Sequence, residues 1–393
     1  MKPLIIIGTG LAGYTVAREL RKLGNSAPII LMTADDGGFY SKPMLSNAFA
    51  QNKAAQQLVT QSAAQMAATL GATILTRTRI GHIDAVAKTV TAGNATFEYD
   101  QLVLALGAQP IRLALAGDAA HQVVSVNHVD DYALFRNRIA ALGRPARVAI
   151  LGAGLIGCEF ADDLAGAGHQ ATLIDPNALP LSALAAPALS RGLHAALRAR
   201  GVAFHGGTTA ARVDQNNEAL RVWLADGTSI DADLVLSAVG LRPDLTLAQA
   251  ADLKTARGIV VDAYGQTSAP GIYALGDCAE YSDADGSRVL PYIAPLMAAA
   301  RAIARTIGGQ PAPIDLKPAP VVVKTPSYPL ALVPPPPQAL AGGEWHTTQH
   351  GTRAICRFYD HQGIMLGFGV APQDAGVRLQ LVGELGKRAE QAA

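Results

Sequence analysis

The sequence predicts an α/β protein with two doubly wound domains of parallel strands and helices, followed by a small C-terminal α+β domain. Two observations predict the doubly wound domains: an apolar stretch runs into a glycine-rich turn and then a helix, first at residues 3–24 and again at 147–168. Short all-apolar runs before glycine are typical of strands buried in a parallel sheet. The third observation is that proline and β-branched residues become frequent from about residue 316, which predicts a separate module.

Composition excludes several classes of protein. The chain has 393 residues, 50% of them hydrophobic and 16% charged, so it can bury a large core. A net charge of +1 argues against a nucleic-acid binder. Three cysteines, at 158, 278 and 356, form no C-x-x-C pair and fit a reducing compartment. No apolar run approaches the roughly 18 residues of a membrane span, and none resembles a signal peptide. We therefore expect a soluble cytoplasmic protein.

The individual elements follow the same order twice. Strand "PLIIIG" (3–8), a helix ending near Gly24 and strand "PIILMTA" (28–34) form a first βαβ unit. Strand "RVAILG" (147–152), helix "CEFADDLAGAG" (158–168) and strand "QATLID" (170–175) form a second. Later strands at 99–110 and 231–243 end in nearly identical turns, and "GIYALGDCAE" (271–280) is a strand that ends in Gly-Asp. An amphipathic helix is expected over 294–307, and strands over 352–360 and 363–370 precede a polar helical tail.

The first glycine pattern has the spacing G-x-G-x-x-G. Gly8 permits a tight turn after the strand, Gly10 lets the backbone approach a pyrophosphate, and Gly13 allows close packing of helix and strand. The helix N-terminus then offers free N–H groups to phosphate. Asp35 ends the following strand, within reach of a ribose hydroxyl. We interpret this as a Rossmann-like dinucleotide site; the alternative is an ordinary glycine-rich turn.

The second pattern, Gly152 to Gly157, has the same context. Asp175 ends the next strand and can accept both hydrogen bonds of an adenosine ribose, while its charge repels a 2′-phosphate. Pro176 and Asn177 follow, with no arginine. This site is therefore predicted to prefer NADH over NADPH; the alternative is that Asp175 is a solvated loop acid.

These motifs resemble a known family, the flavoprotein reductases that bind two dinucleotides. "IIIGTGLAG", "LVLALGAQP", "ILGAGLIGCEF", "LSAVGLRP" and "IYALGDCAE" occur in that family's order across the chain. The resemblance implies that the first fingerprint binds FAD, the second NAD(P)H, and the late Gly-Asp the ribityl chain of FAD. It implies an FAD-binding domain at 1–112 and 241–315, an NAD-binding domain at 113–240 and a C-terminal α+β domain at 316–393.

The segment 37–49, "GGFYSKPMLSNAF", contains no cysteine, so no protein dithiol relays electrons there. It resembles the rubredoxin and ferredoxin reductases, and with "GLIGCEFA", "ALGDCAE" and "VKTP" it is most similar to bacterial rubredoxin–NAD⁺ reductases. In that resemblance Lys42 lies beside the reactive edge of the flavin, Pro43 shapes the pocket, and Glu159 approaches the flavin and nicotinamide rings. Lys42 and Glu159 are the expected catalytic residues. A surface lysine and a simple acid at a helix start are the alternatives.

The expected cofactor-binding residues come from the fingerprints, from the strand-end turns and from the same resemblance. Lys324 and the backbone of Ile293 are expected near the flavin, and the backbone of Ile80, on a strand "TRTRI" (76–80), near the adenine. The full set is Gly8, Thr9, Gly10, Leu11, Ala12, Gly13, Ala34, Asp35, Lys42, Pro43, Ile80, Ala105, Gly107, Gly152, Gly154, Leu155, Ile156, Gly157, Glu159, Asp175, Gly240, Gly276, Asp277, Ile293 and Lys324.

The resulting hypothesis is an NADH-dependent FAD reductase of rubredoxin. Hydride passes from NADH to flavin N5, and two single electrons then pass to the rubredoxin iron. Candidate basic residues for docking an acidic rubredoxin are Lys317, Lys324, Arg301 and Arg353. A reductase of ferredoxin or of nitric-oxide-reducing flavorubredoxin, an NADH oxidase and a non-catalytic NADH sensor remain open.

Other reactive residue types receive no role. His346 and His350 are four residues apart but no acid completes a site, so no metal is expected. Cys158 lies directly behind the second fingerprint and is expected to be a small buried residue without a redox role.

Overall fold

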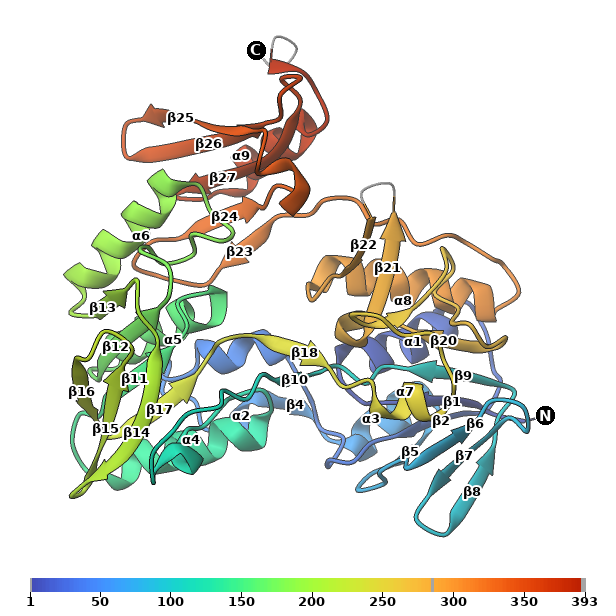
Figure 1. The fold of residues 1–393 in the computed structure, drawn as a ribbon. Coiled ribbons are helices and arrows are strands. Elements are labelled where there is room, and N and C mark those ends of the chain that lie inside the picture. Colours follow the sequence, from blue (N-terminus) through green and yellow to red (C-terminus); the bar gives the residue numbers. More distant parts are fainter. Residues whose placement is uncertain (1, 284–285, 390–393) are drawn as a thin grey trace. The chain divides into compact units, whose positions relative to one another are not determined.

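The computed structural model describes residues 2–283 and 286–389. The chain folds into two compact units (Figure 1). The first consists of Met1–Ser41, Gln57–Gln109 and Leu241–Lys317, and the second of Lys42–Gln56, Pro110–Gly240 and Pro318–Ala393. The predicted FAD-binding domain, 1–112 and 241–315, differs from the first unit chiefly because segment 42–56 belongs to the second. The division into three domains stays a prediction.

A five-stranded parallel sheet lies at the centre of the first unit. Its order is β20 (Ile272–Ala274), β9 (Gln101–Leu104), β1 (Leu4–Ile7), β2 (Ile29–Met32) and β5 (Thr73–Leu75). The central strand β1 pairs in register with β2 and β9, and all four of its residues are buried. Both faces of a parallel sheet are covered, which explains why β1 is a continuous apolar run.

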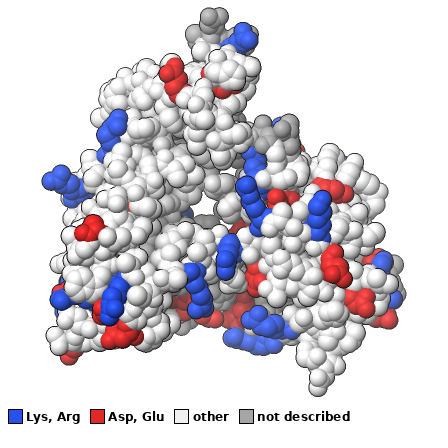
Figure 2. All heavy atoms as spheres, viewed as in Figure 1, with Lys and Arg blue, Asp and Glu red and all other residues white. Residues whose placement is uncertain are grey.

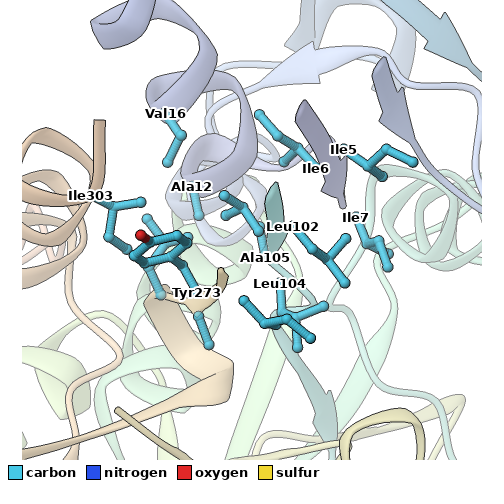
Figure 3. Close-up of a cluster of buried hydrophobic side chains, with 14 of the residues drawn as sticks. Ile5, Ile6, Ile7, Ala12, Val16, Leu102, Leu104, Ala105, Tyr273 and Ile303 are labelled. Carbon is cyan, nitrogen blue, oxygen red and sulfur yellow. The ribbon is translucent and has the colours of Figure 1, made fainter. Parts of the chain in front are cut away.

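Two helices of the first unit pack against one another over this sheet, α1 (Leu11–Lys22) and α8 (Ile293–Ile307). Their apolar faces join the core that also contains Leu104 and Tyr273, and Figure 3 shows Ala12 and Val16 of α1 and Ile303 of α8 in this cluster. Arg301 and Arg305 on α8 are exposed, so the predicted amphipathic helix is confirmed. Gly24, with a φ of 75°, follows the end of α1 as predicted.

The remaining elements of the first unit are short. They are α3 (Ala63–Leu70), α7 (Thr246–Ala250), the pair β3 (Phe39–Tyr40) and β4 (Val59–Gln61), the antiparallel sheet β6 (His82–Asp84), β7 (Thr89–Ala92) and β8 (Ala95–Glu98), and the sheet β19 (Ile259–Val260), β21 (Ala279–Asp283) and β22 (Gly286–Val289). The chain passes between units at α2 (Ala55–Leu58) and at the paired strands β10 (Ala108–Pro110) and β18 (Leu241–Pro243).

The second unit contains a four-stranded parallel sheet of the same design. Its order is β13 (Ala203–Gly206), β12 (Gln170–Asp175), β11 (Arg147–Leu151) and β17 (Leu234–Ser237). Helices and further strands of this region are α4 (Val129–Ala141), α5 (Leu155–Gly166), α6 (Pro187–Ala199), β14 (Ala210–Asn216), β15 (Ala219–Leu224) and β16 (Ser229–Ala232). Strand β12 spans the predicted "QATLID", and α5 begins after the second glycine fingerprint.

The C-terminal part of the second unit is a five-stranded antiparallel sheet with one helix. The order is β23 (Val321–Val323), β24 (Leu330–Val333), β27 (Met365–Ala371), β26 (Arg353–Tyr359) and β25 (Glu344–His350), and α9 (Ala375–Glu384) packs on β27. Phe368 and Leu381 are fully buried in its core. Of the prolines at 334–337, which predict a loop or an edge and not a helix, the first three lie in a loop, whereas Pro337 begins a short 3₁₀ helix (Pro337–Ala339). The predicted fold class, two Rossmann-like domains with a small α+β domain, is confirmed.

The carboxylate of Asp233 joins the starts of β11 and β17. Its side chain is 2% exposed, and Arg144 Nη1 and Arg147 Nη2 lie 2.9 and 2.8 Å from its oxygens. Hydrogen bonds from Arg144, then from Arg147, hold the pKa of Asp233 well below its usual value despite burial.

We expect Asp233→Asn to lower the free energy of unfolding at pH 7 by about 2 kcal/mol, because both arginines lose the negative charge and one of them faces an amide donor in place of an acceptor. The folded-state pKa lies below the unfolded-state value, so the contribution is present above about pH 4 and is lost as the pH falls through the folded-state pKa. Urea denaturation at several pH values measures both effects. Equal stability of the two proteins at pH 7 contradicts this account.

Candidate functional site

The first fingerprint forms a narrow turn between β1 and α1. Gly8 has a φ of 113°, and a Cβ there would lie 2.2 Å from the carbonyl oxygen of Ala105. A Cβ on Gly13 would lie 2.0 Å from the carbonyl oxygen of Gly8. At Gly10, by contrast, a Cβ would have nothing within 4 Å. Close backbone contacts therefore require glycine at Gly8 and Gly13, whereas Gly10 leaves open space at the start of the helix.

The start of α1 has donors for an anion. Its N-cap residue is Gly10, which has no side chain to accept from the first-turn N–H groups. Leu11 and Ala12 stand in that first turn. Asp35 lies nearby: its Oδ1 accepts from Thr9 Oγ1 at 3.4 Å and from Thr33 Oγ1 at 2.7 Å. The structure thus brings Thr9, in the glycine turn, close to Asp35. This is the arrangement expected if the turn binds the pyrophosphate and Asp35 the ribose of one dinucleotide.

Most other predicted residues of the first unit surround the ends of the parallel strands. Ala105 and Gly107 follow β9, and Gly276 and Asp277 form a 3₁₀ turn after β20. A Cβ on Gly276 would lie 3.4 Å from Cβ of Ala12, so the turn stands beside the fingerprint helix. Ala34 is an exposed residue after β2, and Ile293 begins α8 and is 50% exposed.

The expectation for Ile80 was wrong in one respect. Ile80 is not on a strand, because β5 ends at Leu75. The chain then turns at Arg77, whose φ is 52° and whose N–H donates to the carbonyl oxygen of Asp35 at 2.8 Å. The following N–H, of Thr78, donates to Thr33 at 2.7 Å. Ile80 therefore lies in a loop that crosses the end of β2, on the side of Asp35.

The second fingerprint repeats the geometry of the first. Gly152 has a φ of 101°, and a Cβ there would lie 2.8 Å from the carbonyl oxygen of Ala238. A Cβ on Gly157 would lie 1.9 Å from the carbonyl oxygen of Gly152, and one on Gly154 would have nothing within 4 Å. Gly154 is the N-cap of α5, so the helix again starts without a side-chain acceptor. Leu155 and Ile156 follow in its first turn, and Gly240 lies beyond β17.

Asp175 is more enclosed than a solvated loop acid. It is 8% exposed, its Oδ2 accepts from the N–H of Ala153 at 2.6 Å, and its Oδ1 accepts from the N–H and side-chain amide of Asn177 at 2.9 and 2.8 Å. The carboxylate at the end of β12 thus stabilises the glycine turn by accepting a hydrogen bond from its backbone. Sequence reasoning placed Asp175 at the strand end but missed this contact with the turn.

Glu159 is the centre of a buried polar cluster in the second unit. It lies on α5, is 3% exposed, and its Oε2 accepts from Ser46 Oγ at 2.5 Å and from Lys324 Nζ. Its Oε1 accepts from the backbone N–H of Lys324 at 3.0 Å. Lys324 Nζ also lies 3.3 Å from Ser46 Oγ. Two of the predicted flavin-site residues, Glu159 and Lys324, therefore form an ion pair.

Lys42 and Pro43 begin the 3₁₀ helix Lys42–Ser46, which ends at the serine of this cluster. Both are half-buried. The structure therefore ties the segment carrying Lys42 to Glu159 through Ser46, a residue that sequence reasoning did not single out. Asp162 and Asp163, also on α5, were missed as well; their signal was a pair of adjacent acids that follows Glu159 in a mainly apolar helix.

A sequence profile described as pyridine nucleotide-disulphide oxidoreductase matches residues 2–303. The chain belongs to the pyridine nucleotide-disulphide oxidoreductase family. A second profile, described as rubredoxin binding C-terminal domain, matches residues 313–385. The predicted family and the predicted enzyme class, an oxidoreductase, are confirmed.

Individual relatives align with nearly the whole chain. This chain is 40% identical over 388 residues to a rubredoxin-NAD(+) reductase of Alcanivorax borkumensis, and the alignment covers 98% of this chain and 99% of that protein. It is 38% identical to a nitric oxide reductase FlRd-NAD(+) reductase of Aeromonas hydrophila, covering 98% and 96%. The crystal structure of a covalent putidaredoxin reductase–putidaredoxin complex is similar with a TM-score of 0.88 and 25% identity, covering 100% and 95%.

The cysteines of this family member are not arranged for redox chemistry among the described residues. Cys158, Cys278 and Cys356 are all free and buried. Burial, reinforced by Asp175, raises the pKa of the Cys158 thiol, which therefore stays protonated. The expectation that Cys158 is a small buried residue is confirmed.

No group of three or more His, Cys, Asp or Glu suited to a metal occurs in the part of the chain that the structure describes. His346 pairs with an acid, since Glu344 Oε1 lies 2.7 Å from its Nε2. Both lie on β25, where alternate residues share one face of the strand.

The proposed docking residues differ in their surroundings. Figure 2 shows positive and negative side chains interspersed on the visible face of each unit. Lys317 pairs with Asp315 at 2.8 Å, and Arg353 pairs with Asp374 at 2.7 Å. Lys324 is paired with Glu159, whereas Arg301 is exposed on α8.

Within residues 2–283 and 286–389, no helix combines the length and the apolar character that crossing a bilayer needs.

Proposed function

We propose that this protein is an NADH-dependent FAD reductase that passes electrons to rubredoxin. The observation that carries the proposal is the combination of two dinucleotide fingerprints with a C-terminal region, 313–385, that matches a rubredoxin-binding domain. The segment 37–49 contains no cysteine, so a protein disulfide is not an intermediate carrier there. The sequence similarity to rubredoxin-NAD(+) reductases along 98% of the chain supports the same function.

The residues present fit both dinucleotides. In each fingerprint the first and third glycines are required by backbone contacts, and the second leaves space for a pyrophosphate against free N–H groups. Gly8–Gly13, Ala34, Asp35, Ile80, Ala105, Gly107, Gly276, Asp277 and Ile293 would hold FAD, together with Lys42, Pro43 and Lys324. Gly152, Gly154–Gly157, Asp175 and Gly240 would hold NADH. Bound FAD supplies the conversion between hydride transfer and single-electron transfer.

The roles of the charged residues follow from their contacts. Lys42 would supply a cation near the negative charge of a reduced flavin, as the resemblance to rubredoxin reductases implies. Glu159 holds Lys324 by its side chain and by its backbone N–H, so the acid fixes where that second cation stands.

Asp175 carries the preference for NADH. We expect Asp175→Ala to weaken binding of both coenzymes, because the turn at Ala153 loses its acceptor, and to weaken NADH more, by about tenfold. NADPH is affected less because removal of the negative charge also removes its repulsion of the 2′-phosphate. Steady-state KM values for the two coenzymes measure this difference. Equal changes in both contradict the assignment.

A panel of electron acceptors tests the proposed function. The purified protein should release FAD on denaturation and should reduce rubredoxin with NADH faster than ferredoxin, ferricyanide or oxygen. The similarity to nitric oxide reductase FlRd-NAD(+) reductases makes flavorubredoxin the second candidate acceptor, and it belongs in the same panel. Oxygen consumption as fast as rubredoxin reduction identifies an oxidase instead. If none of the acceptors supports turnover and NADH makes the protein dimerise, the protein is a sensor instead.

We also place this reductase in the cytoplasm. Its three cysteines are free and buried rather than paired, which fits a reducing compartment. Cell fractionation with an antibody against the protein tests this placement.

A further inference from the structure

Helix α5 carries three acidic side chains, Glu159 and, one turn later, the adjacent Asp162 and Asp163, and all three are buried. Glu159, Asp162 and Asp163 are 3%, 0% and 4% exposed. Burying a carboxylate costs free energy unless hydrogen bonds or a cation replace its water. Glu159 has its partners in Ser46 and Lys324. The two aspartates therefore also need partners, and the backbone N–H groups that donate to them lie in the same two segments.

Asp163 holds the segment that carries Lys42. Its Oδ2 accepts from the N–H of Phe49 at 2.8 Å, and its Oδ1 accepts from the N–H of Ala50 at 3.0 Å. Both oxygens are thus used on one short stretch of backbone, seven and eight residues after Lys42. Together with the bond from Ser46 to Glu159, this fastens residues 46–50 to α5 at two points.

Asp162 holds the loop that carries Lys324. Its Oδ2 accepts from the N–H of Ser327 at 2.9 Å, and its Oδ1 lies 3.4 Å from Nε of Arg200. The backbone N–H of Lys324 donates to Glu159 at 3.0 Å. The loop 324–327 is therefore fastened to α5 at both of its ends.

We propose that Asp162 and Asp163 are positioning residues for the reductase: Asp163 fixes the segment that presents Lys42, and Asp162 fixes the loop that presents Lys324. One helix then sets the places of two lysines relative to the NADH fingerprint at its own N-terminus. The roles of the lysines rest on the proposed function, whereas the two fastenings are properties of the chain itself.

Asp162→Ala and Asp163→Asn test the proposal as a reciprocal pair in the full-length, FAD-loaded protein. Asparagine at 163 keeps one acceptor and turns an amide donor towards the other backbone N–H, so one of the two hydrogen bonds is lost; alanine at 162 removes the bond to Ser327, which the carbonyl oxygen of an asparagine could still accept. We expect amide hydrogen exchange to become at least about tenfold faster at Phe49 or Ala50 in Asp163→Asn, and at Ser327 in Asp162→Ala. Each variant serves as the control for the other.

A positioning role also requires a redox effect. The midpoint potential of the flavin in Asp163→Asn should shift in the same direction as in Lys42→Met, whereas a purely structural residue leaves it unchanged. If Asp163→Asn does not fold, Asp163→Ser removes the carboxylate without facing an amide donor towards the backbone. Unchanged exchange at Phe49 and Ala50, exchange that rises equally across the whole chain, or an unchanged potential overturns the proposal. Failure to reduce rubredoxin would refute the proposed function but leave the exchange pattern as predicted.

Discussion

Replacing Gly154 with alanine is expected to slow reduction by NADH about 100-fold at low coenzyme concentration, equivalent to about 2.7 kcal/mol of binding, in a protein that stays folded and yellow. Gly154 has an extended backbone with a φ of −76°, and its added Cβ would meet no atom within 4 Å. The methyl group therefore fits the chain itself. It occupies the space through which a pyrophosphate must approach the N–H groups of α5.

The matched control is Gly10→Ala in the first fingerprint. Gly10 has the same extended conformation and the same free space, so this variant should also fold, but it should be purified with little or no FAD. Gly157→Ala controls for a structural effect, because its Cβ would lie 1.9 Å from a backbone oxygen and should destabilise the chain itself. Loss of FAD in Gly154→Ala with normal retention in Gly10→Ala would reverse the assignment of the two sites.

Lys324→Met is expected to lower the free energy of unfolding by about 3 kcal/mol, because it leaves the buried carboxylate of Glu159 without its cation. Glu159 is 3% exposed and retains only the hydroxyl of Ser46 and one backbone N–H. Methionine has a similar length, so loss of packing contributes little. Urea denaturation of the holoprotein, followed by circular dichroism and by flavin fluorescence, measures the change.

The double variant Glu159→Gln/Lys324→Met separates the ion pair from its surroundings. Removing both charges eliminates the unpaired carboxylate, so the double variant should be more stable than Lys324→Met alone. If the two changes simply add, the charges of Glu159 and Lys324 do not interact, and the ion pair does not stabilise the fold.

The sequence was sufficient where the determinants are local. The apolar run before Gly8 and the one before Gly152 predicted β1 and β11, and the acid at the end of "QATLID" predicted both the end of β12 and the place of Asp175. These features follow from short-range rules: a buried strand, a turn that only glycine permits, and a helix that starts without a side-chain cap.

The sequence was insufficient where the contacts are distant. Glu159 is 113 residues from Ser46 and 165 from Lys324, and no periodicity links such positions. The same holds for Asp163 and Phe49. The segment "TRTRI" was expected to be a strand, whereas the structure ends β5 at Leu75 and turns the chain at Arg77, whose N–H donates to the carbonyl oxygen of Asp35. Tertiary hydrogen bonds overrode the local pattern there.

The most direct test of the rubredoxin assignment is a single-turnover stopped-flow experiment. The enzyme is first reduced with one equivalent of NADH in the absence of oxygen and is then mixed with oxidised rubredoxin, whose bleaching is followed. The account predicts two rubredoxins reduced per FAD, at a rate that saturates with rubredoxin concentration and far exceeds reduction by free reduced flavin. Bleaching no faster than with free reduced flavin would contradict the account.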